Sequence, residues 1–147
     1  EFPDVAVVFP VHRNPVVRDV AREMLEGRER FYLIEPLDYE PFAHLMNCSY
    51  MVLTDSGGMQ EEAPSLGKPV LVLRDTTERP EALQAGTVKL VGTVREKIYN
   101  EARLLLSSRG EYEKMARAIN PYGDGQAAIR IVDVIKDFLY VRIGAQG

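Results

Sequence analysis

Residues 50–73 read YMVLTDSGGMQEEAPSLGKPVLVL, and this stretch decides the fold class. Its apolar ends, residues 50–53 and 70–73, have the length and the Val and Leu content of buried strands. Between them, Gly57-Gly58 and Lys68-Pro69 bracket a segment that is typical of a short helix. A strand, a helix and a second strand in this order predict two parallel strands joined by a crossover helix.

The same alternation continues on both sides of this unit. Further strand-like apolar segments occur at residues 5–9, 31–34 and 87–91. Helical patterns alternate with these segments and begin near Pro15, Pro41 and Pro80. Beyond residue 91 the pattern is wholly helical, and two apolar stripes, around Ile98 and Ile135, are expected to pack on the sheet. The chain is therefore predicted to be an α/β domain, with an open, mostly parallel sheet and helices on both faces.

Composition restricts the class of protein. With 147 residues, 46% of them hydrophobic and 27% charged, the chain has the size and composition of one globular domain. A formal net charge of −4 argues against nucleic acid as the main partner. No apolar run approaches the roughly 18 residues that a membrane helix needs. Cys48 is the only cysteine, which excludes an internal disulfide and favours a cytosolic location.

Residues 54–62, TDSGGMQEE, carry the strongest functional signal, because ligands of parallel sheets bind beyond the carboxyl ends of the strands. Gly57 and Gly58 would let a ligand approach the backbone closely, and Ser56 offers a hydroxyl donor to a phosphate. Glu62 lies about one helical turn later, where its carboxylate can accept hydrogen bonds from paired hydroxyls such as those of a ribose. The segment suggests a nucleotide-type ligand.

A purely structural explanation of the same segment is equally open. Asp55 or Ser56 can serve as a helix N-cap, the glycines can form a tight strand-to-helix turn, and the acidic pair can complement the helix dipole. The segment lacks both the GxGxxG spacing and the Walker lysine, which are the more specific phosphate-binding signatures.

Three further residues qualify as ligand contacts by their position. Arg79 follows the fourth strand, beside the phosphate candidate, although pairing with nearby carboxylates is its more ordinary role. His12 lies in the loop after the first strand, where it can meet an anion or form a structural hydrogen bond. Phe42, on the second predicted helix, is either a core or rim aromatic or a surface for a base. No metal site is predicted, because no cysteine pattern and no full set of ligands is present.

Five motifs occur in order along almost the whole chain, namely FPVHRNPVVR at 9–18, residues 54–72, RDTTERPE at 74–81, AGTV at 85–88 and NPYGDG at 120–125. Together they resemble the non-hydrolysing UDP-N-acetylglucosamine 2-epimerases, bacterial enzymes with the two-lobed architecture of GT-B glycosyltransferases. The resemblance implies that residues 1–147 form one Rossmann-like, UDP-binding carboxyl-terminal lobe. The start at Glu1, without a methionine, is interpreted as a cut that removes the amino-terminal lobe.

The resemblance also implies how a UDP molecule would be held. Ser56, Gly57 and Gly58 would bind the diphosphate. Glu62 would take the ribose hydroxyls, and the region of Phe42 would meet the uracil. This division agrees with the chemistry of the residues themselves.

Two other residues receive roles in the same way. Arg79 is counted among the UDP contacts. His12 resembles the histidine that regulated members of the family use near a second, activating UDP-N-acetylglucosamine, so an allosteric contact is expected there. The catalytic residues are unknown and are expected mainly in the amino-terminal lobe and in a His-Arg-Arg-Glu motif upstream of this chain.

The implied activity of the whole enzyme is the interconversion of UDP-N-acetylglucosamine and UDP-N-acetylmannosamine, by elimination and re-addition of UDP, for bacterial cell-envelope polysaccharides. The enzyme is expected to be cytoplasmic and homodimeric, to need no cofactor or metal, and to bind neither nucleic acid nor membranes. This piece alone is expected to bind UDP weakly without turnover. The alternatives are a hydrolysing relative, a GT-B-type glycosyltransferase and a non-catalytic module that senses nucleotide sugars.

Overall fold

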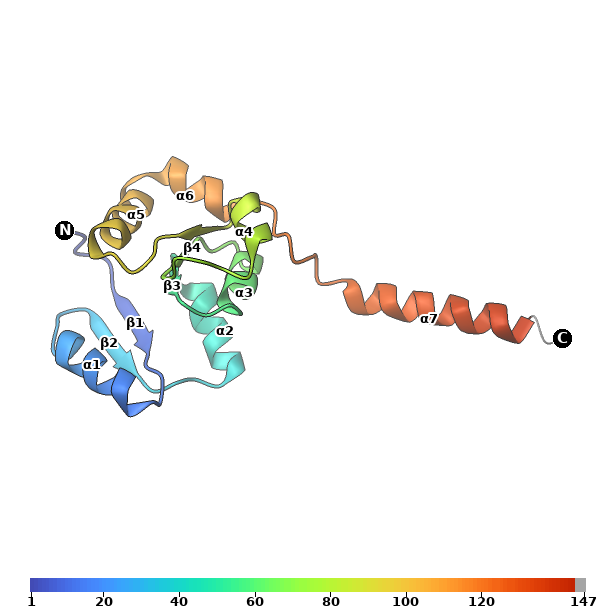
Figure 1. Cartoon of the computed structure of the whole chain (residues 1–147), viewed down its shortest axis with the longest axis horizontal. Coiled ribbons are helices and arrows are strands. Elements are labelled where there is room, and N and C mark those ends of the chain that lie inside the picture. Colours follow the sequence, from blue (N-terminus) through green and yellow to red (C-terminus); the bar gives the residue numbers. More distant parts are fainter. Residues whose placement is uncertain (145–147) are drawn as a thin grey trace. The chain divides into compact units, whose positions relative to one another are not determined.

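The computed structural model describes residues 1–144, and the chain divides into two compact units, Glu1–Leu45 and the part from Met46 onward. Figure 1 shows the elements of both units in sequence colours. We call them unit 1 and unit 2 and describe each by itself. The division falls inside helix α2 (Tyr39–Cys48).

Unit 1 is built on one parallel strand pair. Strands β1 (Val7–Pro10) and β2 (Phe31–Ile34) pair in parallel, and helix α1 (Pro15–Leu25) connects them. The start of α1 follows from its sequence, because the Asn14 side chain accepts a hydrogen bond from the Val16 amide at 3.0 Å and a proline occupies the first helical position. Unit 1 is therefore a parallel strand, helix and strand unit of the predicted kind.

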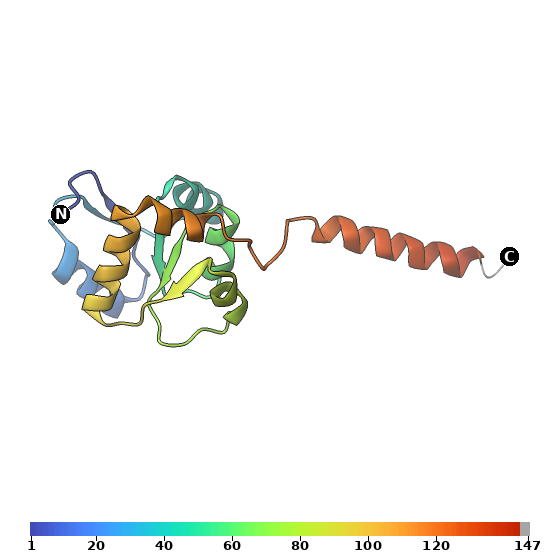
Figure 2. The same cartoon turned by 90° about the horizontal axis from the view of Figure 1, so that it is seen from above.

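Unit 2 carries a three-stranded sheet in the order β3-β4-β5, with every pair parallel. Its elements are β3 (Val52–Thr54), α3 (Met59–Ser65), β4 (Val70–Val72), α4 (Pro80–Ala85), β5 (Val88–Leu90), α5 (Arg95–Ser107), α6 (Arg109–Ala116) and α7 (Ala127–Gly144). Figure 2 shows the same elements from above.

The central strand β4 is the core of unit 2. All three of its residues are fully buried, and Leu71 joins Val91 and Leu105 in an apolar cluster. The residues that pack around this cluster are Met51, Leu73, Ile98, Ala102 and Met115. Since side chains alternate along a strand, the neighbours of Leu71 point to the opposite face, where α3 packs on β4. Helices therefore cover both faces, as the α/β pattern predicts.

The strand prediction holds in type and direction but differs in pairing. Five strands form and all of them pair in parallel, yet they pair as a two-stranded and a three-stranded sheet. The apolar pattern along the chain predicts which segments are strands. It does not predict which strands pair with each other, because pairing depends on contacts between distant parts of the chain.

The prediction for the last apolar stripe is wrong. In α7, Ile131, Val134, Ile135 and Phe138 are between 51% and 68% exposed, so the stripe does not pack on the sheet. The stripe of α5 does pack there.

A pair of stacked tyrosines joins the start of β3 to α6. The rings of Tyr50 and Tyr112 lie 4.1 Å apart at 25°, and the Tyr112 hydroxyl donates a hydrogen bond to the Tyr50 carbonyl at 3.1 Å. The Tyr50 hydroxyl in turn donates to the Leu105 carbonyl at 3.2 Å. Burial raises the pKa of Tyr112 above its ordinary value of 10.0, with a smaller contribution from Tyr50.

Replacing Tyr112 with phenylalanine is expected to lower the free energy of unfolding by about 1 kcal/mol at neutral pH, because the hydrogen bond to Tyr50 is lost while the ring stack remains. The raised pKa makes the Tyr112 contribution complete below about pH 10 and progressively lost above it, since the unfolded chain ionises first. Urea unfolding should therefore show that the difference in free energy of unfolding between the unmodified chain and Tyr112→Phe is smaller above pH 10 than at neutral pH. Tyr140→Phe, at an exposed position, is the control; a difference that grows with pH would contradict the assignment.

Candidate functional site

The turn between β3 and α3, Ser56-Gly57-Gly58, lies at the carboxyl end of β3, where the sequence predicts the ligand site. We call it the diglycine turn. The Ser56 amide donates to the Thr54 hydroxyl at 3.0 Å, which ties the turn to the strand end. Within residues 1–144 the amides of Gly57 and Gly58 donate no hydrogen bond. Two backbone donors of the turn are therefore open.

The structural explanation based on helix capping is wrong for this turn. The N-cap of α3 is Gly58, with φ −61° and ψ −40°, and no side chain forms a capping hydrogen bond. Neither Asp55 nor Ser56 therefore serves as the cap. Gly58 has helical dihedral angles that every residue adopts, so the turn conformation does not require glycine there.

The space around both glycines is open. A Cβ added to Gly57 would meet nothing within 4 Å, and its φ lies outside the left-handed region. A Cβ on Gly58 would meet only ordinary contacts, the Glu62 carboxylate at 3.7 Å and the Ser56 hydroxyl at 3.9 Å. The protein itself thus gives no steric reason for two glycines. What they provide is free room beside two backbone amides that donate no hydrogen bond within the described residues.

Glu62 lies one turn into α3, with its carboxylate beside the diglycine turn, as the 3.7 Å approach to a Gly58 Cβ indicates. Within the described part of the chain its carboxylate forms no ion pair. The side chain is half-buried. A half-buried carboxylate without a cation is able to accept hydrogen bonds from ligand hydroxyls.

The loop after β4 pairs part of its charge internally. Arg74 donates two hydrogen bonds to the Glu78 carboxylate, at 2.9 and 3.0 Å, and this contact holds the pKa of Glu78 below its ordinary value. Arg79 donates through Nε to the Glu61 carboxylate and through Nη1 to the Glu78 carbonyl at 3.2 Å. The hydrogen bond that Arg79 donates to Glu61 raises the pKa of Arg79, which remains a cation at every physiological pH.

Two residues of this site are not predicted by the sequence analysis. Glu61 binds the Arg79 side chain, and Gln60, which is fully buried, contacts both the diglycine turn and the loop after β4. The signal that indicates Glu61 is an acidic residue in the first turn of α3 and an arginine in the next loop at the same sheet edge. A polar residue at a core position of that turn is the signal for Gln60.

Tyr122 of the NPYGDG motif lies on the packed side of the same region. Its hydroxyl is buried and forms no hydrogen bond of standard geometry within residues 1–144. Burial raises the pKa of Tyr122 first, and the negative charges of Glu81 and Glu61 raise it further. The Tyr122 hydroxyl therefore lies close enough to the Arg79 and Glu61 pair to sense both charges.

His12 and Phe42 belong to unit 1, whereas the diglycine turn, Glu62 and Arg79 belong to unit 2. His12 is exposed, and its Nδ1 accepts a hydrogen bond from the Asn14 amide at 3.1 Å, next to the start of α1. Phe42 is half-buried on α2. The contact of His12 with an activator and that of Phe42 with uracil both stay predictions.

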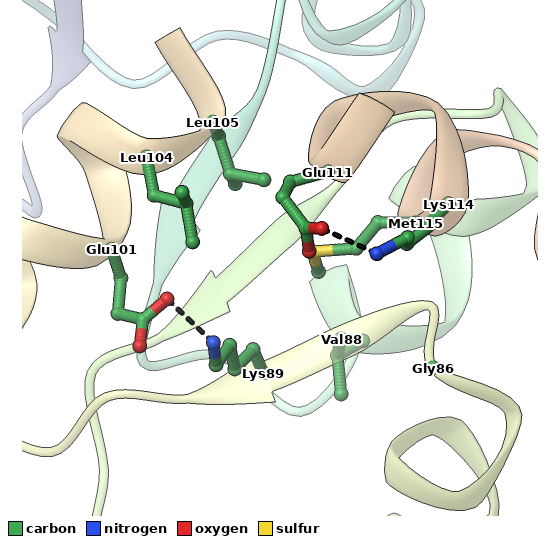
Figure 3. Close-up of a pocket in the computed structure, with 9 residues that line it drawn as sticks. All are labelled: Gly86, Val88, Lys89, Glu101, Leu104, Leu105, Glu111, Lys114 and Met115. Atoms are coloured by element: carbon green, nitrogen blue, oxygen red, sulfur yellow. Dashed lines mark hydrogen bonds and ion pairs between the residues drawn. The ribbon is translucent and has the colours of Figure 1, made fainter. Parts of the chain in front are cut away.

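A separate cavity of about 220 Å³ lies among β5, α5 and α6 (Figure 3) and contains none of the predicted site residues. Its apolar wall is formed by Val88, Leu104, Leu105 and Met115. Its charged groups pair with each other, Lys89 with Glu101 at 2.6 Å and Lys114 with Glu111. The cavity is therefore separate from the predicted diphosphate site.

The described residues, 1–144, contain neither a metal-binding cluster nor a membrane-spanning helix. No three His, Cys, Asp or Glu side chains there gather into a set that could hold a metal ion. None of the helices described has the length and apolar character needed to cross a bilayer.

Comparisons with known proteins agree on one family. The family model of UDP-N-acetylglucosamine 2-epimerase matches residues 1–136. UDP-N-acetylglucosamine 2-epimerase from Bacillus subtilis is 59% identical over 133 residues, which cover 90% of this chain and 35% of that protein. The chain thus spans about a third of the length of the curated relatives that it matches.

Solved structures give the same result. The Neisseria meningitidis UDP-GlcNAc 2-epimerase bound to UDP-GlcNAc matches with a TM-score of 0.86 and 51% identity, over 92% of this chain and 37% of that one. S. aureus MnaA, solved together with UDP, matches with a TM-score of 0.88 and 51% identity, over 95% and 38%. The fold is accordingly that of one lobe of a GT-B-type enzyme. On sequence and structure alike, the chain belongs to the UDP-N-acetylglucosamine 2-epimerase family.

Proposed function

We propose that this chain is the UDP-binding, carboxyl-terminal lobe of a non-hydrolysing UDP-N-acetylglucosamine 2-epimerase. The observation that carries the proposal is the diglycine turn, with open backbone amides and free space above them, in a chain that is 51% identical to relatives solved with UDP and with UDP-GlcNAc. The turn provides hydrogen-bond donors and room for an anion, and membership of the family indicates that this anion is the diphosphate of UDP.

The chemistry of the whole enzyme explains why such a turn is needed. A proton leaves C2 of the sugar, the bond from C1 to the UDP oxygen breaks, and a C1 to C2 double bond forms. UDP departs with the bonding electrons and then adds back, while C2 receives its proton on the other face. We propose that the open amides of Gly57 and Gly58, together with Arg79, stabilise the negative charge on the departing diphosphate. The groups that move the proton are proposed to lie outside this chain.

Glu62 is proposed to hold the ribose. Its carboxylate faces the diglycine turn, and it has no cation to neutralise it within the described residues. Two neighbouring hydroxyls can donate to one carboxylate, whereas an anionic phosphate would be repelled by it. In this proposal the diphosphate end of UDP lies over the glycines and the ribose lies beside Glu62.

The wider setting is also part of the proposal. The product, UDP-N-acetylmannosamine, is proposed to supply bacterial cell-envelope polysaccharides, and the enzyme is proposed to act in the cytoplasm as a homodimer. Mass spectrometry of the products made by the full-length enzyme tests the reaction class, because only an epimerase keeps the sugar attached to UDP. Free N-acetylmannosamine would instead indicate a hydrolysing enzyme.

The 147-residue chain is expected to bind UDP without converting UDP-N-acetylglucosamine. It carries the proposed diphosphate and ribose contacts but lacks the proposed proton-transfer groups. Calorimetry with UDP measures the binding, and proton exchange at C2 in heavy water measures the chemistry. Exchange catalysed by this chain alone would contradict the assignment of proton transfer to another lobe.

Gly57→Ala is expected to keep the fold and to lose UDP affinity. A methyl group at this position meets no protein atom within 4 Å but occupies the space proposed for the diphosphate. We expect an unchanged or slightly higher melting temperature and an affinity at least about tenfold weaker, or about 1.4 kcal/mol. Gly110→Ala on α6, where a Cβ also meets nothing within 4 Å, is the matched control. Normal UDP binding by Gly57→Ala would show that the open space is not used.

Glu62→Ala is expected to weaken UDP binding by about 1–3 kcal/mol through the loss of two charge-assisted hydrogen bonds. The loss should disappear when the ligand is 2′,3′-dideoxyuridine diphosphate, which has no ribose hydroxyls to offer. Calorimetry with both ligands checks this, and Glu96→Ala, at an exposed position on α5, serves as the control. An equal loss for both ligands would remove Glu62 from the ribose site.

A further inference from the structure

Gln60 is a buried amide that joins two loops at the carboxyl edge of the unit 2 sheet. It lies in the first turn of α3 and has no exposed surface. Its Nε2 donates to the Ser56 carbonyl at 3.3 Å, within the diglycine turn. Its Oε1 accepts a hydrogen bond from the Thr77 hydroxyl at 2.5 Å, in the loop after β4. A single side chain therefore contacts both loops of the proposed diphosphate site.

The connection continues from Thr77 to Arg79. The Thr77 hydroxyl donates its proton to Gln60 and accepts a hydrogen bond from the Arg79 amide at 3.0 Å. A hydroxyl has one proton and can accept at the same time, so both bonds are satisfied together. The backbone position of Arg79 is thus set by a chain of hydrogen bonds that starts at the diglycine turn.

The neighbouring residue of α3 orients the Arg79 side chain. Glu61 accepts from Nε of Arg79, and both side chains remain more than a third exposed. Solvent screening makes such a pair weak as a source of stability. Its main effect is geometric, because it holds one edge of the guanidinium and leaves Nη2 without a hydrogen-bond partner in the described part of the chain.

We propose that Gln60 is a positioning residue for the diphosphate of UDP, which acts by fixing Arg79 relative to the diglycine turn. This inference rests on the proposed function. Gln60 does not itself touch the ligand, since it is buried beneath both loops. Without its amide, the Thr77 hydroxyl and the Ser56 carbonyl lose a partner, and the loop that carries Arg79 is free to move away from the turn.

The test compares UDP with uridine, which has no phosphate. Gln60→Met keeps the length of the side chain and removes both hydrogen bonds. The affinity for UDP, followed by NMR titration of the 147-residue chain, is expected to fall about tenfold, whereas the affinity for uridine should not change. A general structural defect would instead lower the affinity for both ligands. Tyr112→Phe, which destabilises unit 2 at a different place, is the control for lost stability.

A double-mutant cycle identifies the route of the effect. If Gln60 acts through Arg79, the combination of Gln60→Met and Arg79→Ala should bind UDP no more weakly than Arg79→Ala alone. Additive losses would overturn the proposal. Thr77→Val and Thr77→Ser keep it testable if Gln60→Met does not fold, because the valine should reproduce the loss and the serine should restore binding.

The possible failures are distinct. If the unmodified chain does not bind UDP, the proposed function falls and the role of Gln60 falls with it. If the unmodified chain binds UDP and Gln60→Met and Thr77→Val bind it equally well, only the role of Gln60 is overturned.

Discussion

Parallel pairing of β3 with β4 is the constraint on which the site depends. Val52 lies opposite Val70 and Thr54 opposite Val72, so both strands run in one direction and end at the same edge. The ladder extends one step further, where the Leu73 amide donates to the Thr54 carbonyl at 2.8 Å. The two loops that follow must therefore begin side by side. Their proximity is a consequence of strand direction and needs no separate cause.

Burial of β4 fixes its register with β3. Every residue of β4 is fully buried, and Leu71 packs in the cluster that holds α5 against the sheet. A register shift by one residue would turn Leu71 to the other face and empty this cluster. The register is thus strongly specified by the core, and the position of the loop that carries Arg79 is specified with it.

The division of chemistry between the loops follows from their electrostatics. The diglycine turn supplies neutral donors and open space, while the loop after β4 supplies a cation whose charge is balanced by Glu61. In a chain of net charge −4, an anionic ligand is attracted only where the local arrangement favours it. A cation held in place by a carboxylate loses some attraction for the anion but has little freedom left to lose on binding.

Local sequence signals predict much of the fold. The apolar runs at β3 and β4, with Gly57-Gly58 and Lys68-Pro69 between them, suffice for a parallel strand, helix and strand unit. They do not suffice to predict that the strands divide into two sheets. The stripe of α7 has helical periodicity, but periodicity states only that a face is apolar and not what covers it.

The candidate site is predictable for residues whose type alone indicates chemistry. Ser56 and Glu62 are examples, since a hydroxyl and a carboxylate flank two glycines at a strand end. Gln60 and Glu61 are not, because their roles arise from contacts with Thr77 and Arg79, more than fifteen residues away in sequence. Such pairs become visible only when the sheet brings their loops together. The reason for the glycines likewise depends on the folded structure, since the open space around Gly57 and Gly58 exists only there.

The most direct test of the central claim is a titration of the isotope-labelled chain with UDP, followed by backbone amide chemical shifts. The account predicts that the largest shifts occur at the diglycine turn and at Thr77 to Arg79, with little change around the cavity of β5, α5 and α6. Largest shifts at that cavity, or no shifts at the diglycine turn, would contradict the claim that unit 2 holds the diphosphate of UDP at the carboxyl edge of its sheet.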